Sequence, residues 1–443
     1  MRKKRHRHIS SFQVIILGFF SVIMMGSLFL MLPISTQDGM GASFPDAVFT
    51  ATSAVCVTGL IIHDTATYWS FFGQLVILFL IQTGGMGVVT IAVSIATAAG
   101  RKISLMQRST MQQSVSAHQV GGIVRMTMFI LKASFVIELA GILLLAPVFC
   151  RDFGVLRGMW YAVFHSISAF CNAGFDLIGI REPFTSLTSY QGQPIVNFTI
   201  MALIIVGGIG FLTWADIKAN KWHLKKYRMQ SKVILSVTLF LILLPAVYFF
   251  FCEFSGLRAW ERVWTSLFQA VTPRTAGFNT ADLSLLSETG KMVVIILMLI
   301  GGSPGSTAGG MKTTTIAVLC ASAHAVFTKK DSAHFFGRRI PEDTVKNAAT
   351  ILLMYVILFL GGGMAISSIE DIPLLSALFE TGSAIGTVGL SLGVTPGLGQ
   401  ISRLILIILM FFGRVGGLTL IFAALSERRG SNARYPQEKI IVG

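Results

Sequence analysis

Four short motifs that carry a glycine in the same place recur along this chain of 443 residues. They read SAVCVTGL (53–60), SAFCNAGF (168–175), VTPRTAGF (271–278) and SAIGTVGL (383–390), and Leu or Phe follows each glycine. Glycine reaches backbone angles that are closed to most other residues. A loop with such angles can turn carbonyl oxygens toward a desolvated cation, where they replace its water. The motifs therefore predict cation ligands on the main chain.

The expected ligands are the three residues that end at each glycine. Glycines in membrane helices also serve close helix packing, but that alternative fits poorly where a loop glycine has the same neighbours four times. We term Gly59, Gly174, Gly277 and Gly389 the motif glycines. The full set is Val57, Thr58, Gly59, Asn172, Ala173, Gly174, Thr275, Ala276, Gly277, Thr387, Val388 and Gly389.

The composition places these motifs in a membrane protein. Hydrophobic residues make up 53% of the chain and charged residues only 12%, against about 25% charged in soluble domains. Apolar blocks of roughly 20 residues or more match the hydrocarbon thickness of a bilayer. The first follows MRKKRHRH, but it is too long for a signal peptide and predicts a retained helix. Eight spans are expected at 14–32, 71–99, 126–149, 194–215, 233–251, 291–326, 347–366 and 404–425.

The net charge of +15 is distributed in a way that argues against nucleic-acid binding. Five segments between the pairs of spans hold 24 of the 35 Lys and Arg residues, whereas the four alternate polar regions hold 7 of them and 13 of the 20 acidic residues. This alternation follows the positive-inside rule. It predicts cytoplasmic termini, basic inner loops and an acidic outer surface that attracts cations.

The motifs divide the chain into a fourfold repeat of roughly 110 residues. Each unit has an apolar block, a stretch of about 10–14 residues too short to span a membrane, the motif loop and a second apolar block. Two spans per unit make the copies parallel, so they can close around one pore, whereas inverted repeats are typical of rocking transporters. The expected segments are 1–12 (basic N-terminus), 13–99, 100–216, 217–328 and 329–426 (repeats), and 427–443 (tail).

The second apolar blocks also contain glycine clusters, which suit close helix packing. The longest, IGGSPGSTAGGMKT (300–313), interrupts the sixth span. It predicts a broken helix beside a wet cavity, with a simple kink as the alternative. The run superficially resembles a phosphate-binding loop, but Met311 stands before Lys312 where the motif requires Gly-Lys.

A few charged residues lie within or near the spans. Arg414 in the eighth span should face the protein interior or a cavity, either as an electrostatic barrier or as a structural hydrogen-bond donor. Lys132 and Glu138 in the third span suit packing or snorkelling. Asp64, Asp176 and Asp282, which each follow a motif glycine, suit either an acidic outer vestibule or ordinary solvated loops.

CVTGL, CNAGF, RTAGF and GTVGL make the chain resemble the membrane subunit of the Ktr/Trk/HKT superfamily of potassium transporters over nearly its whole length. The eight spans suit the bacterial Ktr branch. The resemblance implies an all-α membrane protein with four parallel helix–pore loop–helix repeats (M1–P–M2) and potassium uptake across the plasma membrane. Serine in place of the first glycine accompanies sodium transport in plant relatives, so Gly59 favours potassium. A Na⁺-permeable or weakly selective transporter of the same fold is the alternative.

The resemblance also implies a gate and partners. The partners are a second copy of the chain and a cytosolic ring of RCK-type, KtrA-like nucleotide-binding subunits, since the chain has no such motif of its own. Basic loops such as 218–228 could meet that ring or anionic lipid. No enzyme motif occurs, and K⁺ is the only ion expected. The gate residues are Gly301, Gly302, Ser303, Gly305, Ser306, Thr307, Gly309, Gly310, Lys312 and Arg414.

Overall fold

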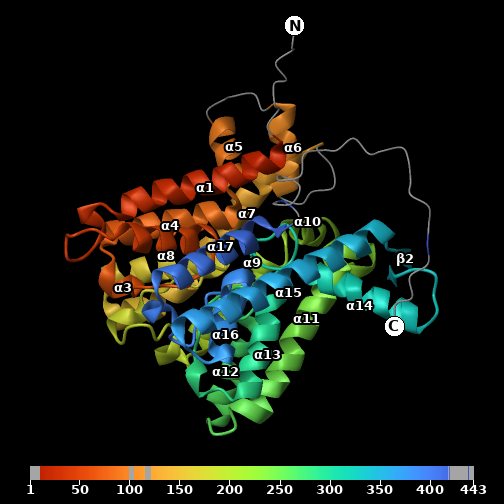
Figure 1. Cartoon of the computed structure of the whole chain (residues 1–443). Coiled ribbons are helices and arrows are strands. Elements are labelled where there is room, and N and C mark those ends of the chain that lie inside the picture. The colour runs from red at the N-terminus through yellow and green to blue at the C-terminus, as the bar shows by residue number, and fades with distance from the viewer. Residues whose placement is uncertain (1–9, 99–103, 115–120, 418, 420–437, 439–443) are drawn as a thin grey trace.

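The computed structural model of the chain describes residues 10–98, 104–114, 121–417, 419 and 438 (Figure 1). Most of the predicted basic N-terminus, residues 1–9, lies outside these ranges. All of the predicted tail 427–443 except residue 438 lies outside them as well. The regular secondary structure of the described part is helical apart from one short hairpin, as the all-α prediction requires.

The first apolar block of each predicted repeat forms one long helix. These helices are α1 (Ser11–Leu30), α7 (Ile123–Phe153), α11 (Met229–Tyr248) and α15 (Glu342–Glu370). Each is long and apolar enough to cross a membrane, and only 22–39% of its most apolar window is buried inside the protein. The remaining Leu, Ile and Phe side chains face outward, where lipid would cover them.

The short semi-polar stretches form buried helices that end at the motifs. They are α2 (Phe44–Val55), α8 (Val155–Phe170), α12 (Ala259–Val271) and α16 (Leu374–Gly386). With 12 to 16 residues, they extend about 18–24 Å at 1.5 Å per residue, too short to cross a bilayer. Their C-terminal halves are almost fully buried, so all four ends lie in the protein interior.

The second apolar blocks differ from the prediction because three of them are broken helices. Gly87 ends one helix with φ +85°, and Gly210 separates two helices that meet at 96° with φ +92°. Only the break at 300–312 was expected. Four described helices can therefore span a membrane, or five if the bent pair counts as one. The second-block helices are α4 (Phe71–Met86), α5 (Val88–Ala98), α9 (Pro194–Gly208), α10 (Phe211–Asn220), α13 (Glu288–Leu299), α14 (Thr313–Phe327) and α17 (Gln400–Val415).

Shorter elements connect these helices. The strands β1 (His334–Phe335) and β2 (Arg338–Arg339) form an antiparallel hairpin between α14 and α15. The other connecting elements are α3 (Thr65–Tyr68), α6 (Leu105–Ser114), a π-helical turn at Phe249–Glu253, and 3₁₀ turns at Pro33–Ser35, Ile178–Ile180, Thr188–Tyr190, Leu224–Lys226, Leu283–Leu285 and Thr395–Gly397.

The packing of the helices follows a cyclic order. The second-block helix of each predicted repeat packs against the short helix of the next one: α4 against α8, α9 against α12, and α13 against α16. The last of these contacts returns to the beginning of the chain, because α17 packs against α2. In Figure 1 the blue α17 accordingly lies near the red and orange helices from the beginning of the chain. The four short helices are thus brought together in the order of the sequence.

Candidate functional site

The four motif glycines meet in the same cyclic order. All have positive φ, between +70° and +94°. A Cβ atom built on any of them would lie within 2.7 Å of a carbonyl oxygen of the next motif loop, closer than real side chains allow. Only glycine fits these places. The pairs are Gly59 with Ala173, Gly174 with Ala276, Gly277 with Val388 and Gly389 with Thr58.

The residue two places before each glycine is also left-handed. Val57, Asn172, Thr275 and Thr387 have φ between +50° and +63°, a conformation that side-chain-bearing residues rarely adopt. In three loops this residue ends the short helix in a Schellman cap. There the next amide reaches back to the helix: Thr58 N to Ser53 O, Ala173 N to Ser168 O and Val388 N to Ser383 O, each 2.8 Å.

Serine side chains at the start of three motifs form hydrogen bonds to the main chain at the end of the same motif. Ser53 Oγ accepts a hydrogen bond from Gly59 N at 3.1 Å, and Ser383 Oγ accepts one from Gly389 N at 2.9 Å. Ser168 Oγ instead donates to the carbonyl of Phe175 at 2.7 Å. The sequence showed that three motifs begin with Ser-Ala, but it did not predict these hydrogen bonds.

The glycine clusters of the second blocks pack against the ends of the short helices, as the packing alternative expected. A Cβ on these glycines would collide with a main-chain carbonyl oxygen, so a larger residue would push the short helix away from its place. The contacts are Gly84 with Val55, Gly207 with Phe170 and Gly413 with Ile385.

The 300–312 loop crosses beneath the motif loops from the second predicted repeat to the fourth. On one side, Ser303 N donates to Gly208 O at 3.0 Å and Thr307 N to Gly207 O at 3.2 Å. On the other side, Gly310 N donates to Gly413 O at 3.1 Å. The loop is therefore held at both ends by main-chain bonds.

Thr307 joins this loop to a motif residue. Its Oγ1 donates to Phe170 O at 3.0 Å and lies 2.9 Å from Asn172 Oδ1. Asn172 Nδ2 in turn donates to Arg274 O at 3.3 Å, in the third motif loop. One hydrogen-bonded chain thus connects the 300–312 loop with two motif loops.

Arg414 and Lys312 place two cationic side chains below the motif loops. Arg414 donates to the carbonyls of Thr307 and Gly84, and to Gly85 O at 3.1 Å. Lys312 Nζ donates to Ala308 O and Gly309 O, at 2.9 and 3.0 Å. Arg414 therefore makes the structural hydrogen bond to the loop that the sequence had left as one alternative.

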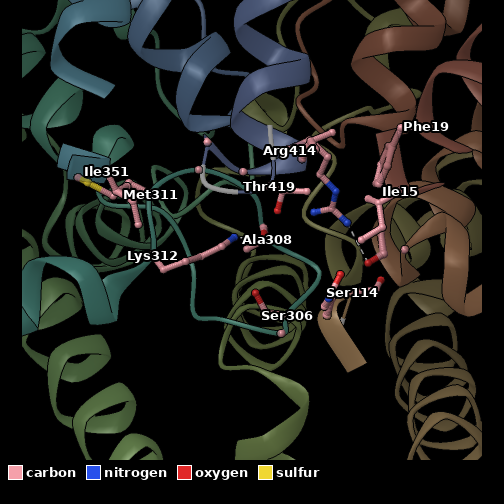
Figure 2. Close-up of a pocket in the computed structure, with 18 of the residues that line it drawn as sticks. Ile15, Phe19, Ser114, Ser306, Ala308, Met311, Lys312, Ile351, Arg414 and Thr419 are labelled. Carbon is pink, nitrogen blue, oxygen red and sulfur yellow. Dashed lines mark hydrogen bonds between the residues drawn. The ribbon is translucent and has the colours of Figure 1, made fainter. Parts of the chain in front are cut away.

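Both cations line a cavity of about 300 Å³ beneath the loop. Figure 2 shows the Arg414 and Lys312 side chains converging on it from different segments. Ser306 of the loop and Ser114 at the end of α6 also line this cavity, with Ile15 and Phe19 from α1. Polar and apolar groups from distant parts of the chain thus surround one space below the loop.

The acids that follow the motif glycines occupy different surroundings. Asp64 is buried, caps α3 through bonds from Ala66 N and Thr67 N, and accepts from Phe184 N at 3.2 Å. Burial, with the Asp64 carboxylate nearby, raises the pKa of Asp176 to about 7. Asp282 is exposed and caps a 3₁₀ turn. The three acidic residues therefore do not share one environment, so neither alternative from the sequence, an acidic vestibule or solvated loops, fits all of them.

The two charged residues of the third span also separate. Glu138 is 5% exposed and accepts a hydrogen bond from Gln82 Nε2 at 3.0 Å, between α7 and α4. This contact agrees with a packing role. Lys132 is exposed on the same helix, where its side chain can extend along the surface.

Comparison with known proteins identifies relatives that match nearly the whole length of this chain. The chain is 40% identical to the potassium/sodium uptake protein NtpJ of Enterococcus hirae, over 100% of this chain and 99% of that protein. It is 38% identical to the Ktr system potassium uptake protein B of Bacillus subtilis, over 97% and 96%. The crystal structure of the potassium transporter TrkH from Vibrio parahaemolyticus matches the fold with a TM-score of 0.74 at 19% identity, over 96% and 87%.

The family model for TrkH, described as a cation transport protein, matches residues 3–434. This range includes the motif loops, the 300–312 loop and Arg414. Because the family transports ions and the helices are apolar outside, the chain is a multi-pass membrane protein and not an enzyme. On these matches, the chain belongs to the TrkH family of cation transport proteins.

Proposed function

We propose that the chain takes up K⁺ across the bacterial plasma membrane through a filter formed by the four motif loops. The observation that carries this proposal is the ring of motif glycines, in which the place of each missing side chain is taken by a carbonyl of the next loop. Such oxygens can replace the hydration shell of a bare cation. The close approach of these carbonyl oxygens thus explains both why glycine is needed at each position and how a cation could be bound.

The relatives support potassium as the transported ion. The Bacillus subtilis protein is named for potassium uptake, and the Enterococcus hirae protein for potassium and sodium. The second name favours a specific alternative, a Na⁺-permeable or weakly selective transporter of the same fold. The proposed ligands are the twelve motif residues from Val57–Gly59 to Thr387–Gly389, arranged as four parallel repeats with the boundaries predicted from the sequence.

We further propose that residues 301–312 and Arg414 form a gate below the filter. The loop crosses the space beneath the motifs, and Arg414 fastens it to the first predicted repeat through Gly84 and Gly85. A guanidinium group in this position also repels a cation that leaves the filter. A regulator that opens the path would have to break the main-chain hydrogen bonds at both ends of the loop and the bond from Arg414 to Thr307.

The proposed assembly is a homodimer on a cytosolic ring of RCK-type nucleotide-binding subunits. The names of several relatives refer to a Ktr system, which agrees with separate components. The basic segments then face the cytoplasm together with both termini. Exposed Trp222 and the lysines around it offer a surface for such subunits or for anionic lipid.

Ion flux into proteoliposomes tests the proposed filter. We expect the wild type to take up K⁺ in preference to Na⁺, and Gly59→Ser to lower the K⁺/Na⁺ flux ratio at least fivefold. The reason is that a side chain on Gly59 collides with the Ala173 carbonyl across the ring. Gly39→Ser is the matched control, since Gly39 also has positive φ but no atom within 4 Å of its missing side chain.

An unchanged ratio in folded Gly59→Ser would refute the filter role of this glycine. Equal K⁺ and Na⁺ flux through the wild type would instead favour the weakly selective alternative. No flux of either ion through wild-type protein reconstituted with its regulatory subunits would contradict the transport proposal itself.

A further inference from the structure

Two buried polar side chains on the short helices accept hydrogen bonds from main-chain N–H groups in the segments that follow the motif glycines. His165 Nε2 accepts from Leu177 N at 3.3 Å, and Glu380 Oε1 accepts from Leu392 N at 2.9 Å. Each acceptor stands nine residues before its motif glycine, and each donor stands three residues after it. The same hydrogen bond, from the main chain after the loop to a side chain on the short helix, therefore occurs at the second and fourth loops. We call it a tie; its acceptor is an imidazole in one loop and a carboxyl group in the other.

Glu380 collects three hydrogen bonds from the segment after the fourth motif glycine. Besides Leu392 N, Ser391 Oγ donates to Oε1 at 2.8 Å, and Thr395 Oγ1 donates to Oε2. All three partners can donate to the two carboxyl oxygens. The residue is fully buried, and no ion pair to it occurs among the residues that the structure describes. Its hydrogen bonds are thus directed to the loop.

His165 is held in the orientation that this contact requires. Its Nδ1 lies 2.7 Å from Tyr161 O one helical turn earlier. A carbonyl can only accept, so Nδ1 carries the proton and Nε2 is free to accept from Leu177. The ring also lies 6.2 Å from that of Phe278, the residue after the third motif glycine. His165 thus contacts two adjacent loops.

The first and third loops lack this tie. Thr50 and Phe268 occupy the corresponding places on α2 and α12. Because the four loops follow one another around the ring, the second and fourth face each other across it. The two ties consequently hold opposite sides of the ring.

We propose that His165 and Glu380 are positioning residues that set cation selectivity by fixing the second and fourth motif loops from behind. The inference rests on the proposed filter function. Carbonyl oxygens favour K⁺ over the smaller Na⁺ only while their number and spacing around the ion are maintained. The left-handed residues Asn172 and Thr387 store backbone strain in these two loops, and the surrounding bonds must hold it.

The test compares variants that lose the acceptor with variants that keep one. His165→Leu and Glu380→Leu remove it, whereas His165→Gln and Glu380→Gln place an amide oxygen within reach of the same N–H. Thr50→Val and Phe268→Leu are the matched controls from the other two loops. K⁺ and Na⁺ flux into proteoliposomes is measured for each, together with the thermal unfolding midpoint in detergent.

We expect the leucine variants to lower the K⁺/Na⁺ flux ratio at least fivefold and the glutamine variants to stay within about twofold of the wild type. Phe268→Leu should lose thermal stability and keep its selectivity, which separates positioning from folding. Leucine variants that fold and keep the wild-type ratio would overturn the inference and leave the filter proposal intact. A wild type without K⁺ preference would instead contradict the filter proposal.

If Glu380→Leu fails to fold, Ser391→Ala and Thr395→Val serve in its place. They remove two donors to Glu380 without altering the short helix, and we expect a smaller shift of the flux ratio in the same direction. A double variant with unchanged selectivity would also overturn the assignment of Glu380. For His165, Tyr161→Phe is the control for nearby packing, because the hydrogen bond uses only the Tyr161 main chain.

Discussion

Arg274 occupies the fourth place of the third motif, where the other motifs have Cys56, Cys171 and Gly386. Its side chain is 4% exposed. Nη2 donates to Thr238 Oγ1 on α11 at 3.2 Å, and Nη1 has no partner among the described residues. A buried cation without a counter-charge beside the proposed filter would raise the energy of ions bound there.

Replacement of Arg274 by methionine should therefore strengthen K⁺ uptake at low external K⁺. Two unit charges roughly 10 Å apart repel each other by about 1–2 kcal/mol at an effective dielectric constant of about 20. We expect the half-saturating K⁺ concentration to fall about 5-fold or more. Arg274→Lys, which keeps the charge, and Thr238→Val, which removes only the hydrogen bond, should both remain near the wild type in the same flux assay. A methionine variant with unchanged half-saturation would contradict this.

At this scale the sequence predicted the motif glycines because positive φ excludes other residues. It could not predict the ties from His165 and Glu380. In each case acceptor and donor are twelve residues apart, on either side of the loop, and the two acceptors differ in type. Nor could it show that Arg274 lacks an acidic partner, because that depends on what packs around the guanidinium group.

Among the helices, glycine clusters do two things that look alike in a sequence. In the second apolar blocks, one glycine admits the carbonyl end of a short helix, as Gly84 and Gly207 do. A later glycine adopts positive φ and ends the helix, as Gly87 and Gly210 do. Hydropathy does not distinguish these two roles of glycine. The long first helices were therefore predicted well, whereas the breaks at Gly87 and Gly210 were not.

The 300–312 loop gives a prediction at the level of elements. Thr307→Val removes the hydroxyl whose single proton is shared between Phe170 O and Asn172 Oδ1, a hydrogen bond worth about 1 kcal/mol. If the loop closes the path, its loosening should raise K⁺ flux without regulatory subunits about 3- to 10-fold. Ser306→Ala is the control, since Ser306 Oγ bonds only to Ser303 O within the loop. Equal flux in both variants would contradict a gating role.

In the whole molecule, an ion pair joins the first and fourth predicted repeats outside the ring of motif glycines. Arg403 Nη1 at the start of α17 lies 2.9 Å from Asp46 Oδ1 in the first turn of α2. His63 Nε2 lies 3.2 Å from the other oxygen of Asp46. The motifs predicted a fourfold repeat, but they could not predict this contact, because its members are 357 residues apart.

Arg403→Ala should lower the thermal unfolding midpoint in detergent. The pair is only about one-fifth exposed, so its loss costs about 1 kcal/mol, toward the upper end for exposed pairs, and we expect a decrease of about 2 °C. The control is Arg339→Ala, whose pair with Glu342 is well exposed and 3.8 Å long. An equal decrease in both variants would show that the closing contact has no special part in stability.

The ring of motif glycines is built from a single polypeptide, and this has a genetic consequence. In an assembly of four identical subunits, one codon change alters every side of the conduit at once. Here a mutation at Gly59 leaves Gly174, Gly277 and Gly389 as they were. In the proposed filter, ion preference can therefore change one loop at a time, and each single mutant keeps three unaltered loops.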